Sequence, residues 1–162
     1  MQRIEPQEGQ ESVWDYPRPP RLEATTKQLR ILFGGEEIAN TVSGWRVLET
    51  SHPPVYYLPL ADIRIDYLIK SPRSSFCEFK GVATYWTLQI GRESAQDAAW
   101  SYEAPTADFE SIRGYLAFYA SRMQACYVDG EQVQAQVGDF YGGWITEAVV
   151  GPFKGGVGTW GW

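Results

Sequence analysis

The chain has few residues of the kinds that build metal centres and disulfide scaffolds. Its 162 residues include two cysteines, Cys77 and Cys126, and a single histidine, His52. A structural zinc site needs about four nitrogen, sulfur or oxygen ligands with close pairs among them. A disulfide scaffold needs more cysteines in a short secreted chain. We therefore expect no metal site and two reduced thiols.

Long apolar runs and clusters of basic residues are missing too. No stretch approaches the roughly 18 apolar residues that span a bilayer, and residues 1–10 lack the apolar centre of a signal peptide. The 14 basic and 20 acidic residues give a formal net charge of −6. Such a surface repels a phosphate backbone unless a basic patch exists. We expect a cytoplasmic protein that binds neither nucleic acid nor a membrane.

One glycine-rich motif suggests a cofactor, but its context excludes that function. Residues 156–161 match the G-x-G-x-x-G pattern, which binds a dinucleotide only between a strand and a helix. Only Trp162 follows in this sequence. We therefore expect no cofactor.

Aromatic residues and turn-formers are abundant. The chain has seven Trp, ten Tyr and seven Phe, together with 16 Gly and ten Pro. This mixture favours strands and tight turns over long helices. We predict a mainly β fold, a single compact antiparallel β domain with one or two short helices.

Local patterns place the elements along the chain. A helical turn is predicted over residues 59–63, and a short helix from the N-cap Thr106 to Gly114. Asp129-Gly130 predicts a hairpin turn. The predicted strands cover residues 29–33, 41–50, 54–58, 64–70, 80–90, 98–103, 115–121, 124–128 and 131–136.

Composition divides the chain into three parts. Residues 1–28 are predicted to be a flexible arm because prolines stand among many charges there, although Trp14 and Tyr16 leave docking open. Residues 29–137 form the β-rich core domain. Residues 138–162 are a Gly- and aromatic-rich extension, which we expect to pack on the core or on a neighbouring subunit because its large rings would otherwise be exposed.

The densest cluster of polar and aromatic groups is residues 49–59, Glu-Thr-Ser-His-Pro-Pro-Val-Tyr-Tyr-Leu-Pro. Functional sites concentrate polar groups on loops held by a rigid scaffold. A capped strand end with Tyr57 in the core explains the cluster equally well. A Cys77–His52 pair would allow thiolate chemistry, but nothing in the sequence brings the two together. We favour a buried thiol and a hydrogen-bonded histidine.

Three stretches resemble a family of bacterial proteins, domain of unknown function 427. They are residues 49–59, then 76–86 (Phe-Cys-Glu-Phe-Lys-Gly-Val-Ala-Thr-Tyr-Trp), then 99–105 (Ala-Trp-Ser-Tyr-Glu-Ala-Pro) followed by 115–119. The resemblance covers about residues 28–135 and implies a compact, tent-like β fold. Relatives of that fold carry paired Cys-x-x-Cys ligands, and this chain does not, which favours a metal-free version. The family is also labelled nucleotidyltransferase-like, but this chain shows no acidic metal-binding pair or Gly-Ser phosphate loop.

The family pattern highlights positions that can be understood as one site. Because residues alternate along a strand, only one of Tyr85 and Trp86 faces a given side. From the highlighted positions and His52 we predict a ligand-binding set without assigning catalytic roles: Glu49, His52, Tyr57, Cys77, Lys80, Tyr85, Trp86 and Tyr102.

Three functions remain open. The first is a small-molecule-binding module with an aromatic pocket, in which Lys80 holds a small anionic ligand beside Glu49. The second is a structural or protein-interaction domain that uses the arm and the tail. The third is an enzyme that uses Cys77 or His52. A monomer and a homodimer are both compatible with the sequence.

Overall fold

The computed structural model describes residues 1–138 and 140–162, and its fold is mainly β, which confirms the predicted fold class. Among these residues, one four-stranded antiparallel sheet has the order β10-β9-β8-β7, that is Leu116–Phe118, Glu93–Tyr102, Gly81–Ile90 and Leu68–Cys77. A second has the order β12-β11-β3-β4, that is Glu131–Gln132, Ala125–Val128, Leu29–Phe33 and Glu36–Thr41.

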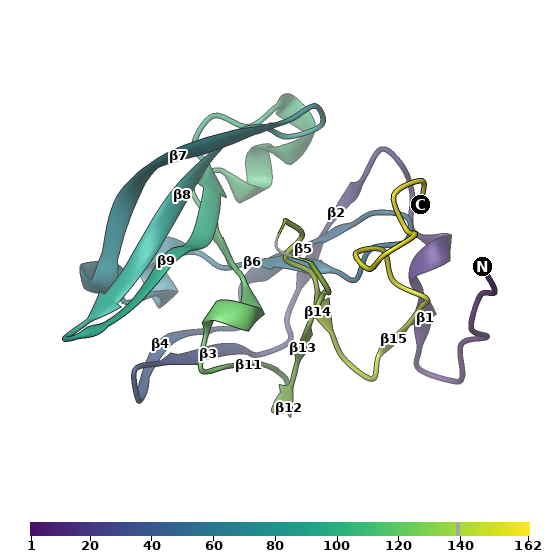
Figure 1. Ribbon diagram of the computed structural model, residues 1–162, viewed down its shortest axis with the longest axis horizontal. Coiled ribbons are helices and arrows are strands. Elements are labelled where there is room, and N and C mark those ends of the chain that lie inside the picture. The colour runs from purple at the N-terminus through teal and green to yellow at the C-terminus, as the bar shows by residue number, and fades with distance from the viewer. Residues whose placement is uncertain (139) are drawn as a thin grey trace.

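Smaller sheets lie beside these two (Figure 1). A three-stranded sheet has the order β2-β5-β6, that is Arg21–Thr25, Gly44–Leu48 and Val55–Tyr57. β13 (Gln134–Ala135) pairs with β14 (Trp144–Ile145), and β1 (Glu11–Ser12) pairs in parallel with β15 (Val149–Val150). Short 3₁₀ helices cover Val13–Asp15, Leu60–Asp62, Ile65–Tyr67, Ala107–Ile112 and Ala120–Arg122.

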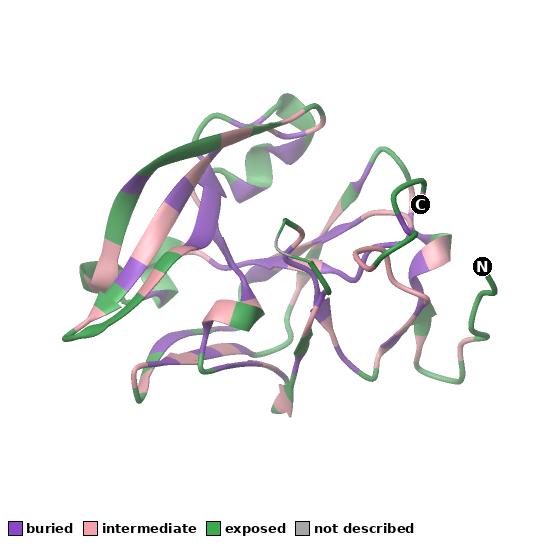
Figure 2. Ribbon diagram, in the orientation of Figure 1, coloured by how far each residue is buried: buried purple, intermediate pink, exposed green. Residues whose placement is uncertain are grey.

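The alternation of side chains along β8 and β9 separates two hydrophobic cores. Leu88 and Ala99 belong to a core shared with β3 and β11. Tyr85, Trp100 and Tyr102 belong to a second, aromatic core on the other face. Figure 2 shows that the second half of β9 is buried, whereas most of the edge strand β7 is exposed. The aromatic core is the part of the fold that positions the candidate site.

A pair of backbone hydrogen bonds joins the three-stranded sheet to β10. The Leu58 amide donates to the Leu116 carbonyl at 2.8 Å, and the Leu116 amide donates to the Leu58 carbonyl at 2.9 Å. This bridge follows directly after β6, so it brings Tyr57 beside the rings of β9.

The structure corrects the prediction of a flexible arm over residues 1–28. β2 lies in a sheet, paired with β5 from Arg21–Leu48 to Thr25–Gly44. Val13 and Tyr16 are buried against Leu48 and Val149, and Trp14 Nε1 donates to the Pro152 carbonyl at 2.9 Å. The arm orders because β5 and Leu48 of the core, together with the tail, pair with its strand and cover its apolar residues.

Two local predictions also differ from the structure. The segment after Thr106 is a 3₁₀ helix, and the Thr106 hydroxyl donates to the Phe79 carbonyl at 2.6 Å instead of capping the helix. The strand predicted over residues 64–70 begins as the 3₁₀ helix Ile65–Tyr67 and becomes β7 only at Leu68.

Within the described part of the chain, none of the helices has the length and apolar character that crossing a membrane would require.

If the arm is part of the folded unit, shortening a buried side chain there lowers stability. Val13 is fully buried, whereas Val157 is fully exposed. We expect Val13→Ala to lower the free energy of unfolding by about 2 kcal/mol through lost apolar burial and the cavity left behind. Val157→Ala should leave it within about 0.5 kcal/mol. Urea denaturation of both variants checks this, and equal stabilities would show that the arm is not docked.

Candidate functional site

A cavity of about 270 Å³ lies beside the aromatic core, and all but one of the predicted site residues line it. Tyr85 and Tyr102 come from β8 and β9, and Tyr57 comes from β6. The residues that complete the predicted set there are Glu49, His52, Cys77 and Lys80. The structure thus gathers groups that are up to 53 positions apart, from Glu49 to Tyr102.

Trp86 is the exception: it belongs to the predicted set, but it does not line the cavity. It follows Tyr85 on β8 and so points to the opposite face, where it packs against the other hydrophobic core. Its Nε1 donates to Ser101 Oγ at 3.0 Å. Strand alternation allows only one of the two neighbouring rings to reach the cavity.

Trp100 and Tyr119 contribute rings that the predicted set left out. Trp100 Nε1 donates to the Tyr57 hydroxyl at 3.3 Å, and the Trp100 and Tyr119 rings lie 4.6 Å apart. Trp100 shares the face of Tyr102 at a spacing of two, and this signal could have identified it. Tyr119 lies just beyond β10, and no pattern in the sequence placed it here.

The rings of Tyr57, Trp100, Tyr102 and Tyr119 form an aromatic wall of the cavity, and burial keeps its three phenols neutral. It raises the pKa of Tyr57 and of Tyr102 well above the ordinary value, and it raises the pKa of Tyr119 to about 12. The Tyr85 hydroxyl shares a hydrogen bond of 2.8 Å with the Ser75 hydroxyl. Neutral phenols can donate and accept hydrogen bonds, so the wall offers polar contacts without negative charge.

Lys80 brings a positive charge to this aromatic wall. Only 9% of the residue is exposed, and its Nζ lies 5.9 Å from the Tyr102 ring centroid and 5.7 Å from that of Phe109. Within residues 1–138 and 140–162, no carboxylate oxygen approaches this ammonium within 4.0 Å. Its backbone is fixed by hydrogen bonds to the Cys77 carbonyl at 3.2 Å and from the Thr106 amide at 3.1 Å.

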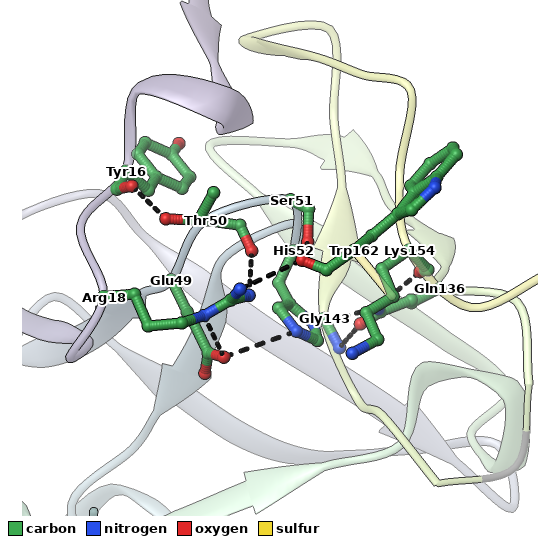
Figure 3. Close-up of polar contacts among 10 residues, drawn as sticks. All are labelled: Tyr16, Arg18, Glu49, Thr50, Ser51, His52, Gln136, Gly143, Lys154 and Trp162. Atoms are coloured by element: carbon green, nitrogen blue, oxygen red, sulfur yellow. Dashed lines mark hydrogen bonds and ion pairs between the residues drawn. The ribbon is translucent and has the colours of Figure 1, made fainter. Parts of the chain in front are cut away.

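A polar network fixes the opposite side of the cavity (Figure 3). Gln136 Nε2 donates to His52 Nδ1 at 3.2 Å and to the Lys154 carbonyl at 2.7 Å. Because Nδ1 accepts, His52 carries its proton on Nε2, which lies 3.6 Å from Glu49 Oε2. The same carboxylate oxygen lies 3.3 Å from Arg18 Nε. The arm, the core and the tail meet in this network.

His52 is neutral in this environment. Burial lowers its pKa to about 4, and the positive charges of Lys154, Arg18 and Lys80 act in the same direction. The nearby Glu49 carboxylate, 3.6 Å from His52 Nε2, is paired with Arg18 at 3.3 Å. Near pH 7 the imidazole therefore lines the cavity as a neutral hydrogen-bonding group and not as a cation.

The two cysteines lie in different environments. Cys77 lines the cavity, whereas Cys126 is buried in the other core, where burial raises the pKa of its thiol to about 12. Both nitrogens of His52 face other partners, and among the described residues no hydrogen bond joins Cys77 to His52. The pair does not form a nucleophile and its base in this structure. Nor does the described chain bring three or more His, Cys, Asp or Glu side chains together as metal ligands.

A family model matches about two thirds of the chain. The family described as a domain of unknown function (DUF427) matches residues 21–129, and no curated protein matches the chain. The matched region runs from β2 to the end of β11 and includes the aromatic wall and Lys80. Gln136 and the tail residues that line the cavity, Phe140, Tyr141 and Gly142, lie outside it.

The buried, neutral His52 makes stability depend on pH. The unfolded chain takes up a proton near pH 6.5, whereas the folded protein does so only near pH 4, so this contribution is complete above pH 6.5 and is lost as the pH falls towards 4. At pH 4.5 we expect the wild type to have lost about 2–3 kcal/mol more stability than His52→Gln, relative to pH 8.

Urea denaturation of both proteins between pH 8 and 4.5 measures this difference, and the subtraction removes the titration of other groups. If the difference in stability between the two proteins stays constant across this pH range, His52 is accessible to solvent and its pKa is not lowered by folding.

Proposed function

The chain belongs to the DUF427 family, a family of unknown function, and on that premise we propose that it is a small-molecule-binding protein whose cavity takes a single planar ring bearing one anionic group. The observation that carries this proposal is the ammonium of Lys80, which lies at an aromatic wall without a carboxylate partner among the described residues.

The Lys80 ammonium has hydrogen-bonding capacity left for a ligand, because no ion pair among the described residues engages it. Contact with the faces of Tyr102 and Phe109 contributes about 0.5–2 kcal/mol, but aromatic rings do not provide lone pairs for its three N–H donors. A carboxylate or phosphate oxygen of a ligand would provide them.

Charges of both signs surround the cavity. Its lining includes Glu49 and Glu78 as well as Lys80, but Arg18 lies 3.3 Å from the Glu49 carboxylate and compensates it, and the positive charges of Lys80 and Lys154 both act on His52. Aromatic cages elsewhere hold quaternary ammonium groups, but Lys80 would repel such a ligand here.

Size and wall chemistry restrict the ligand further. Pockets for drug-sized ligands measure about 300–1,000 Å³, and this cavity measures about 270 Å³. Trp100, Tyr102 and Tyr57 supply flat apolar surface, and offset or edge-on contacts between rings add about 0.5–1.5 kcal/mol beyond burial. One aromatic ring with a carboxylate fits these constraints.

The enzyme alternative has less support. It needs an activated thiol or imidazole, and His52 is engaged by Gln136 while its pKa lies near 4. Binding requires only the groups already gathered around the cavity.

Removing the ammonium should remove the preference for anions. We expect benzoate to bind the wild type at least about tenfold more tightly than neutral benzamide, since a hydrogen bond to a charged group contributes about 1.5–3 kcal/mol. Lys80→Met should bind both equally weakly. Lys70→Met, which removes an exposed lysine outside the cavity, should behave as the wild type does.

NMR titration monitored at the cavity residues measures these affinities. The proposal fails if millimolar benzoate leaves the wild-type cavity signals unchanged, or if Lys80→Met keeps the preference.

A further inference from the structure

The cavity needs a segment that the family match does not include. Gln136, Phe140, Tyr141 and Gly142 line it, and all four follow residue 129, where the match ends. We call Gln136 and residues 140–143 the roof. A chain that stopped at the end of the match would leave this side of the cavity open.

The roof lies in close contact with the aromatic wall. A Cβ atom on Gly142 would overlap the Trp100 ring, and one on Gly143 would lie 2.6 Å from Pro53 Cγ and 2.7 Å from Gln136 Oε1. Only glycine fits at either position. The absence of both side chains brings the tail backbone onto the indole of Trp100.

Hydrogen bonds hold the roof at both ends. The Gln136 amide donates to the Gly143 carbonyl at 3.0 Å, and the Gly143 amide donates to Gln136 Oε1 at 3.0 Å. The Tyr119 hydroxyl, from the wall itself, donates to the Phe140 carbonyl at 3.0 Å. The next residue, Trp144, is fully buried and its Nε1 donates to the Phe118 carbonyl at 3.0 Å.

Tyr141 connects the roof to the charged side of the cavity. Its ring lies 4.7 Å from the His52 imidazole in an edge-on arrangement, and Lys154 Nζ lies 5.4 Å from its centroid. Tyr141 is only partly buried. The ring thus lines the cavity and keeps some contact with solvent.

We infer that the roof is the specificity-determining element of the cavity, which favours one-ring anions over two-ring anions. This inference rests on the proposed binding function. The wall and Lys80 recognise the anionic ring, and the contact of Gly142 with Trp100 sets how far the ligand extends.

The test uses the full chain with one substitution that lifts the roof and one that does not. Gly142→Ala places a methyl group against the Trp100 ring. Gly161→Ala makes the same chemical change in the same tail, where nothing lies within 4 Å of the added carbon.

Two readouts are compared. The first is the affinity for benzoate and for 2-naphthoate. We expect the wild type and Gly161→Ala to prefer benzoate by roughly tenfold, and Gly142→Ala to lose that preference. The second is the reaction rate of Cys77, which lines the cavity, with a thiol reagent. This rate should rise several-fold in Gly142→Ala alone, while the buried Cys126 stays unreactive.

The outcomes separate the two ideas. If neither anion binds the wild type, but Cys77 reacts faster in Gly142→Ala, the binding function fails and the roof remains the cover of the cavity. If benzoate binds, but Gly142→Ala matches Gly161→Ala in selectivity and labelling, the roof inference is overturned. If Cys126 also reacts in Gly142→Ala, the variant is unfolded, and Tyr141→Ala is judged by the same two criteria.

Discussion

The site depends on one arrangement, the ammonium of Lys80 held at a wall of aromatic rings. The turn that follows β7 fixes the Lys80 backbone, because its amide bonds to the Cys77 carbonyl and its carbonyl accepts from the Thr106 amide. The side chain then reaches Tyr102 and Phe109. Aromatic rings stabilise a cation only in part, so the Lys80 ammonium can still donate hydrogen bonds to a ligand in the cavity. The polar network and the roof complete the cavity around this group.

Much of the fold and of the aromatic wall follows from short-range patterns. The strands over 29–33 and 124–128 were predictable from their apolar residues and flanking turn signals, and they coincide closely with β3 and β11. Alternation along β8 and β9 decides that Tyr85, Trp100 and Tyr102 share the cavity while Trp86 faces away. Alternation alone would have removed Trp86 from the predicted site.

The parts that sequence reasoning missed depend on partners distant in the chain. His52 and Gln136 are 84 positions apart, and their contact determines the tautomer of the imidazole. The arm lacks enough apolar surface to order alone, yet Arg18 donates to the Thr50 and Trp162 carbonyls at 2.8 and 3.0 Å, and Trp14 packs edge-on against Trp162. No local pattern reports such contacts. These contacts bring the arm and the tail together next to Glu49 and His52. Segments outside the family match therefore help to hold the charged groups of the cavity in position.

A crystal structure of the wild type grown with benzoate tests the central claim most directly. We predict one benzoate in the cavity, with a carboxylate oxygen within hydrogen-bonding distance of Lys80 Nζ and its ring against Trp100 or Tyr102. A cavity filled by protein side chains, with Lys80 Nζ paired to a protein carboxylate, would contradict it.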